Sequence, residues 1–81
     1  MTVQEALSVG SEARYEDHSR WWTIAAIVRR QAGSYTARIS RQEQDCHSES
    51  FVQAASLAVL ERVLKQTGVD PHVGWRPVSG Q

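Results

Sequence analysis

Two strand-like runs, residues 20–30 and 35–41, constrain the fold of this chain more than any other feature. The first run is rich in β-branched and aromatic residues, and the second alternates between apolar and polar side chains. The four residues between them, QAGS, contain a glycine that suits a tight turn. With the turn centred on Ala-Gly, Val28 lies opposite Ala37. The sequence therefore predicts an antiparallel hairpin over 20–41.

This hairpin is expected to have one apolar face and one mixed face, because successive side chains point to opposite sides of a sheet. The apolar face carries Ile24, Ala26, Val28, Tyr35, Ala37 and Ile39. The mixed face carries Trp21, Thr23, Ala25, Ile27, Arg29, Thr36, Arg38 and Ser40. Two independent strands agree on the apolar face, and this agreement supports the hairpin.

The strongest helical pattern covers residues 51–66, which are good helix formers and contain no glycine or proline. Ser50 and Gln53 form an S-x-x-Q capping signal at its start. Gly68 follows its end, where a left-handed residue commonly stops a helix. This long helix is expected to cover the apolar face of the hairpin, since no other segment is large enough.

The predicted fold class is α+β, with a small antiparallel sheet of two to three strands packed on the long helix. Thr2 and Glu5 form a capping box that predicts a short N-terminal helix. Residues 12–19 fit either an edge strand or a loop. The expected order is therefore α-β-β-β-α around the central hairpin.

The length of 81 residues predicts a single domain over residues 1–81. Residues 69–81 contain both prolines and are expected to form a loosely ordered tail. A chain this short has a thin core and marginal stability.

The charge is balanced overall but unevenly distributed along the chain. Lysine plus arginine and aspartate plus glutamate each number nine, so the net charge is zero. No acidic residue occurs between positions 20 and 41, and this ribbon carries Arg20, Arg29, Arg30, Arg38 and Arg41. Arginine offers a planar fork to carboxylates and phosphates and also stacks on aromatic rings.

The mixed face of the hairpin is the predicted partner-binding surface. Its proposed contact residues, with two adjacent arginines, are Trp21, Ile27, Arg29, Arg30, Arg38 and Arg41. Tryptophan and arginine are enriched at protein interaction hot spots. The simpler alternative is that the N-terminal helix or Trp75 covers this face and leaves no free surface.

These features favour a non-enzymatic protein–protein interaction module that binds a partner with an acidic or mixed surface. A small regulatory or inhibitor protein, encoded by a bacteriophage or mobile element, is one concrete form of this hypothesis. The alternative is RNA or DNA binding through the same ribbon, by stacking and phosphate contacts. Zero net charge argues against that alternative, because specific nucleic-acid binders are usually strongly basic.

The expected order of elements resembles that of double-stranded RNA-binding domains over roughly residues 2–66. The segment AASLAVLERVL is also similar to the alanine-rich final helix of that family. The family carries a lysine cluster at the start of this helix, where the present chain reads HSESFVQAA with Glu49. The resemblance thus implies a fold but not the RNA-binding activity.

A second surface is predicted on the long helix, where Phe51, Ala54, Ala58 and Arg62 lie near one side. Small residues there would let another helix approach closely and form a homodimer seam. The alternative is that the alanines only favour the helix and that Phe51 tucks under the preceding loop.

No catalytic, metal or cofactor site is predicted. Adjacent Cys46 and His47 lack the ligand spacing of zinc sites. A single cysteine cannot form an internal disulfide, so the cytoplasm is the expected compartment. No apolar run reaches the roughly 18 residues needed to span a bilayer, and no membrane partner is expected.

Overall fold

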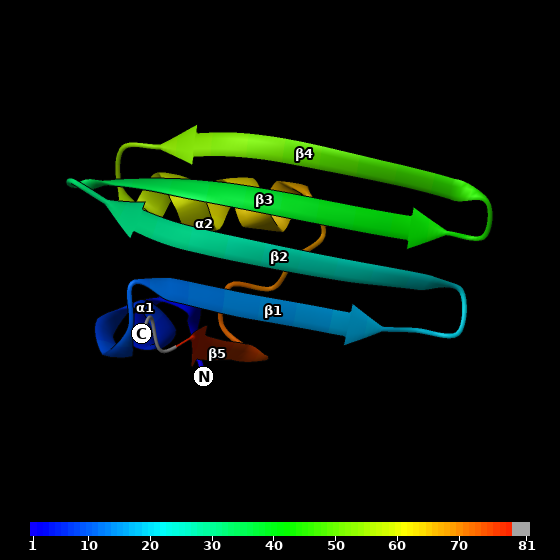
Figure 1. Cartoon of the computed structure of the whole chain (residues 1–81), viewed down its shortest axis with the longest axis horizontal. Coiled ribbons are helices and arrows are strands. Elements are labelled where there is room, and N and C mark those ends of the chain that lie inside the picture. Colours follow the sequence, from blue (N-terminus) through cyan, green and yellow to red (C-terminus); the bar gives the residue numbers. More distant parts are fainter. Residues whose placement is uncertain (79–81) are drawn as a thin grey trace.

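The computed structural model describes residues 1–78 as an α+β fold (Figure 1). Its elements in chain order are α1 (Val3–Val9), β1 (Glu12–His18), β2 (Trp22–Gln31), β3 (Ser34–Glu43), β4 (Cys46–Ala54), α2 (Leu57–Gln66) and β5 (Trp75–Val78). The strands form one antiparallel sheet with the order β4-β3-β2-β1-β5. The α+β class is confirmed, but this five-stranded sheet is larger than the predicted two to three strands.

The central hairpin of β2 and β3 has the predicted register. Val28 pairs with Ala37, and Ala26 pairs with Ile39. The turn residue Ala32 has φ 47° and the following glycine has φ 83°. Two positive φ angles in a two-residue loop match the twist of the flanking strands, which is why such turns are favoured in hairpins. The alternation in the sequence therefore identified both the strands and the register.

Strand β4 is the largest departure from the prediction. Residues 46–50 were expected in a polar connection and residues 51–54 in the long helix, yet all pair with β3. A second two-residue turn at Gln44–Asp45 joins the strands, with Gln44 at φ 49°. This turn places the new strand in register with β3. Pairing with β3 then satisfies backbone N–H and C=O groups of residues 46–54, some of which the first turn of a helix would leave unpaired.

Helix α2 consequently begins at Leu57, not at residue 51. Its N-cap is Ser56, whose hydroxyl accepts a hydrogen bond from the backbone N–H of Val59 at 3.3 Å. The S-x-x-Q pattern at Ser50 therefore does not cap a helix. Gly68 follows the helix with φ 88°, as predicted.

The prediction of a homodimer seam along the long helix is wrong, because its four residues do not lie on one helix. Phe51 and Ala54 belong to β4, whereas Ala58 and Arg62 belong to α2. Ala54 is also buried, at 3 % exposure, and is not available to a second helix. The shifted helix start is the physical reason, since the four residues no longer share one helical face.

Replacing Ser56 with alanine is expected to lower the free energy of unfolding by about 1 kcal/mol, because the first turn of α2 loses its cap. The matched variant Ser50→Ala changes an exposed hydroxyl within β4 and is expected to have a much smaller effect. Urea unfolding of both variants measures the difference. A larger loss for Ser50→Ala would contradict the observed helix start.

Both helices pack against the same face of the sheet, which we call the inner face. Helix α1 buries Val3, Ala6 and Leu7, and α2 buries Leu60 and Leu64. These side chains meet the apolar residues of the central hairpin in one hydrophobic core. In Figure 1 the sheet lies in front of α2, so the opposite face of the sheet looks toward the viewer.

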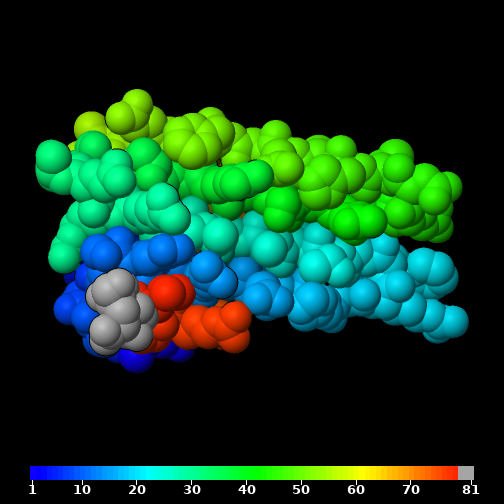
Figure 2. Space-filling view, in the orientation of Figure 1, coloured from blue at the N-terminus to red at the C-terminus, as the bar shows by residue number. Residues whose placement is uncertain are grey.

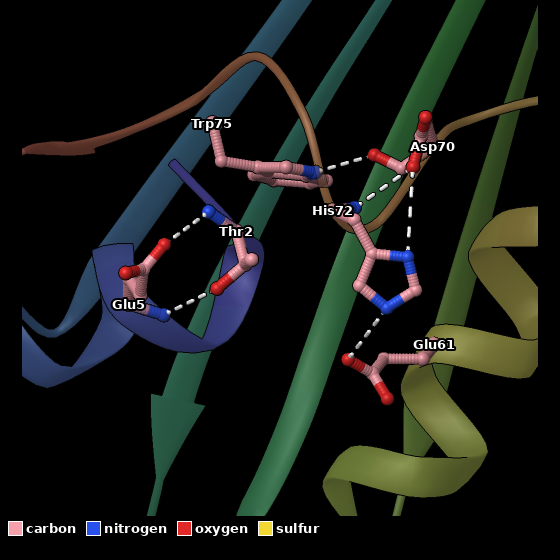
Figure 3. A network of polar contacts seen from close by, with 6 residues as sticks. All are labelled: Thr2, Glu5, Glu61, Asp70, His72 and Trp75. Atoms are coloured by element: carbon pink, nitrogen blue, oxygen red, sulfur yellow. Dashed lines mark hydrogen bonds and ion pairs between the residues drawn. The ribbon is translucent and has the colours of Figure 1, made fainter.

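The short helix α1 is held by the predicted capping box. The Thr2 hydroxyl accepts from the Glu5 backbone N–H at 2.9 Å, and the Glu5 carboxylate accepts from the Thr2 N–H at 2.9 Å (Figure 3). The hydrogen bond from the Thr2 backbone N–H is the main cause that lowers the pKa of the Glu5 carboxyl. Both orphan donors at the start of the helix are thereby satisfied.

Residues 69–78 differ from the expected loose tail, while residues 79–81 lie outside the described part of the chain. Val69, Pro71 and Trp75 are buried, and β5 pairs with β1. The Pro71 carbonyl accepts a hydrogen bond from the Val3 N–H at 2.8 Å. The segment is ordered because it completes the sheet and closes the core beside α1.

Trp75 is the main anchor of this segment. Its ring packs on Tyr15, with centroids 5.4 Å apart, and its indole N–H donates to the Asp70 carbonyl at 2.8 Å (Figure 3). The ring therefore adds apolar area to a thin core without leaving its polar group unpaired. Burial is also the main cause that raises the pKa of the Tyr15 hydroxyl.

Candidate functional site

The face of the sheet that looks away from both helices is called the outer face. Residues directly paired across antiparallel strands share a face, so the register defines its members. They are Glu12, Arg14, Glu16 and His18; Thr23, Ala25, Ile27, Arg29 and Gln31; Ser34, Thr36, Arg38, Ser40 and Gln42; His47, Glu49, Phe51 and Gln53; and Arg76 and Val78. Both helices lie behind the sheet in Figure 1, and the space-filling view shows β2, β3 and β4 open on this side, with no other segment of residues 1–78 in front of them (Figure 2).

One row of the outer face crosses every strand of the sheet. In spatial order it contains Phe51, Arg38, Ile27, Arg14 and Arg76. Phe51 is 74 % exposed, which makes it the most exposed large apolar residue of residues 1–78. The row therefore carries two apolar groups with a cation between them, followed by the adjacent cations Arg14 and Arg76.

A shallow hollow of about 260 Å³ lies on this row. Its lining residues are Ile27, Arg29, Gln31, Thr36, Arg38 and Phe51. Ile27 lies at the centre of the sheet and Phe51 at its edge strand, with Arg38 between them. The hollow has the size of one or two inserted side chains and is too small to enclose a drug-sized ligand.

Two arginines of the row, Arg38 beside Phe51 and Arg76 at the opposite end, each bind a glutamate. Arg38 Nε donates a hydrogen bond to Glu49 Oε1 at 2.8 Å, and Arg38 Nη2 lies 2.7 Å from the same oxygen as an ion pair. Near the opposite edge of the sheet, on the same face, Arg76 Nη2 donates to Glu16 Oε1 at 3.0 Å. Both pairs are exposed, so each contributes little stability but fixes the direction of an arginine.

A histidine completes each of these pairs. His47 Nε2 lies 3.3 Å from Glu49 Oε2, and His18 Nε2 lies 2.9 Å from Glu16 Oε2. The hydrogen bond from Arg38 is the main cause that lowers the pKa of the Glu49 carboxyl. The hydrogen bond from His18 is the main cause that lowers the pKa of Glu16. Two Arg–Glu–His groups thus flank the apolar centre of the outer face.

The remaining two arginines of the outer face share one acid. Glu12 Oε2 lies 3.6 Å from Arg29 Nε, and Glu12 Oε1 lies 3.8 Å from Arg14 Nε. The Glu12 side chain is only 16 % exposed, and its Oε1 accepts no hydrogen bond from residues 1–78. Every arginine of this face therefore has an acidic neighbour, with three glutamates shared among four arginines.

The structure brings together only part of the sequence-predicted site. Ile27, Arg29 and Arg38 line the same hollow. Trp21 lies in the β1–β2 connection at the far end of the sheet, 58 % exposed, with the Arg20 guanidinium 5.0 Å from its ring centroid. The sequence places Trp21 on the same side as Ile27, but the ladder rows of Thr23 and Ala25 separate them.

Arg30 and Arg41 do not join this site. Arg30 lies on the inner side, where it lines a hollow together with Leu7 and Leu57 from the two helices. Arg41 also points to the inner side, and its guanidinium lies beside Gly68 at the end of α2. Both arginines lie on the inner side because successive side chains of a strand point to opposite faces, and each arginine is next to an outer-face residue in the sequence.

Three residues of this surface were not predicted from the sequence: Phe51, Arg14 and Arg76. Phe51 was assigned to a helix, and the other two lie on strands that were left open or assigned to a tail. The two-residue segment Gln44–Asp45 between polar stretches was the available signal for the extra strand. No comparable pattern marked the four-residue strand β5.

Comparisons of the chain with known protein families, curated proteins and solved structures find no match. The four consecutive strands between α1 and α2 also depart from the three-stranded order of double-stranded RNA-binding domains. Within residues 1–78, neither helix has the length and hydropathy to cross a membrane, and no group of three acidic, histidine or cysteine side chains is placed to hold a metal ion.

Proposed function

We propose that this protein binds another protein through its outer face, with Ile27, Arg38 and Arg29 at the centre of the contact. The observation that carries this proposal is an uncovered sheet face with an apolar centre, a shallow hollow and fixed charges around it. Such an apolar centre with a polar rim is the usual anatomy of a protein interface.

The ion pairs of the outer face favour a protein partner over a nucleic acid. Phosphate binding depends on free cations that release counterions from the backbone. Arg38 and Arg76 already donate to glutamates, and Arg29 lies beside a third glutamate. A phosphate would have to displace these carboxylates, whereas a protein surface of mixed charge can pair with both signs.

The same geometry defines the chemistry of the partner surface. An apolar side chain would enter the hollow beside Ile27, while acidic and basic groups around it would pair with Arg38 and Glu49. This chemistry suits a small regulatory or inhibitor protein that acts by occupying a surface, without catalysing a reaction. Most of the binding free energy would come from the apolar centre of the contact, as in other interfaces with hot spots.

Photo-crosslinking from defined positions tests this proposal. A photoreactive residue at Ile27 is expected to crosslink to a protein in nuclease-treated lysate of the source cells. The same residue at Arg62, an exposed position on α2, is the matched control and is expected to give no such adduct. Adding Arg38→Glu to the Ile27 probe is expected to remove the adduct.

The outcomes separate the two candidate functions. Equal crosslinking from both positions, or none from Ile27, would contradict the proposed surface. Loss of the adduct on nuclease treatment, together with binding of a single- or double-stranded oligonucleotide that weakens steeply with salt, would instead indicate nucleic-acid binding.

A further inference from the structure

The two edges of the sheet differ in how they are protected from further pairing. The described edge strand β5 has four residues and contains Pro77, and short strands and proline are both common edge protections. The opposite edge, β4, has nine residues, Cys46–Ala54, with unbroken pairing to β3 and no bulge. It contains neither proline nor lysine. β4 is therefore an unprotected edge.

The register shows which backbone groups of β4 are free. Gln31 and Ser34 close the two-residue turn of the central hairpin and form a hydrogen-bonded pair. Hydrogen-bonded pairs alternate with non-hydrogen-bonded pairs along an antiparallel ladder, so the even-numbered residues of β3 bond to β2. The odd-numbered residues of β3 therefore bond to the even-numbered residues of β4. The N–H and C=O groups of His47, Glu49, Phe51 and Gln53 consequently point away from the sheet.

The side chains restrict how a second β4 could pair with this edge. A symmetric antiparallel pair centred on Glu49 would set two identical carboxylates opposite each other, which is unfavourable. A pair centred on Ser50 would set Glu49 opposite an apolar ring. A pair centred on Phe51 sets the two rings opposite each other and Glu49 opposite Gln53, whose amide can donate to it.

We propose that two copies of this chain associate through β4, in an antiparallel pair centred on Phe51, to form one continuous sheet. The free N–H and C=O groups of Glu49, Phe51 and Gln53 are paired in that arrangement. The most exposed large apolar side chain of the described residues is also covered by its symmetry mate. Cross-strand aromatic pairs are among the most favourable pairs in antiparallel sheets.

A second copy is the occupant that this edge fits best, because the edge is complementary to itself. Every residue from 48 to 54 meets a partner without opposing like charges, and each hydrogen-bonded pair exchanges two backbone bonds. The pairing also joins the outer faces of both copies into one surface, with the Phe51 rings at its centre. This association does not depend on the proposed partner binding.

Mass measurement on the purified chain tests the proposal. Sedimentation equilibrium is expected to show a dimer that dissociates on dilution. The variant Phe51→Lys puts two ammonium groups opposite each other and is expected to raise the dimer dissociation constant at least about tenfold. Val73→Lys, which adds the same charge at a 63 % exposed position outside β4, is the matched control and is expected to remain dimeric.

A monomer at all concentrations up to roughly 1 mM, or an unchanged dimer of Phe51→Lys, would overturn the proposal. Amide hydrogen exchange of the unmodified chain gives a second readout that needs no variant. The amides of Glu49, Phe51 and Gln53 are expected to become protected as concentration rises. Concentration-independent exchange at all three would equally refute edge pairing. Ile27→Asp is expected to leave the dimer intact, which distinguishes this association from partner binding.

Discussion

Replacing Trp75 with alanine is expected to lower the free energy of unfolding by about 3–5 kcal/mol, the range seen when a large aromatic side chain is removed from a core. The side chain is 3 % exposed and packs against Tyr15. Domains of ordinary size have about 5–15 kcal/mol of stability, and an 81-residue chain lies near the lower end of that range. The variant should therefore be largely unfolded near physiological temperature.

Thermal unfolding followed by circular dichroism measures this effect, with Trp21→Ala as the matched control. Trp21 is 58 % exposed, and its removal should leave the midpoint nearly unchanged. Each kilocalorie per mole lost should lower the midpoint by roughly 4–8 °C in a domain of this size. Equal midpoints for the two variants would mean that residues 69–78 do not form part of the core.

Aspartate at Val28 is expected to prevent folding, whereas aspartate at the neighbouring Ile27 is expected to be tolerated. Val28 is fully buried on the inner face, where an unpaired carboxylate costs several kcal/mol. Ile27 lies on the outer face between Arg14 and Arg38 in the same row, so a carboxylate there gains cationic neighbours. The stability of Ile27→Asp should change by no more than about 1 kcal/mol.

Urea unfolding and amide NMR spectra of both aspartate variants check this contrast. Ile27→Asp should give a dispersed spectrum like that of the unmodified chain, and Val28→Asp should give the narrow dispersion of an unfolded chain. Comparable loss of structure in both variants would mean that both faces of β2 are covered.

The central hairpin could be predicted from the sequence because its signal is entirely local. The alternation of apolar residues in both strands and the Ala-Gly turn between them permit only one register with a uniform apolar face. The capping box at Thr2 is equally local, and it correctly identified the start of α1. Where short-range chemistry specified the structure, sequence reasoning was sufficient.

Strand β4 could not be predicted from its own residues. Both of its faces are largely polar, since His47 and Glu49 alternate with Cys46 and Ser48, and this hides the two-residue period. The following residues are strong helix formers, so local propensity extended the helix into the strand. Pairing with β3 overrode that propensity, as tertiary contacts often do.

Most of the candidate surface depends on long-range pairing, and this limited the prediction of the site. Ile27 and Arg38 were found together because the hairpin register joins them. Arg76 reaches the same face only through the pairing of β5 with β1, across 60 positions from Glu16. No local pattern indicates that contact.

Thiol labelling of two single-cysteine variants tests most directly the claim that the two helices cover one face of the sheet and leave the outer face open. In a Cys46→Ser background, Arg38→Cys should react with a soluble maleimide at nearly the rate of an unfolded thiol. Val28→Cys should react only as fast as the chain unfolds, because its side chain is fully buried. Strong protection of the cysteine at position 38 in the monomeric protein would contradict an open outer face.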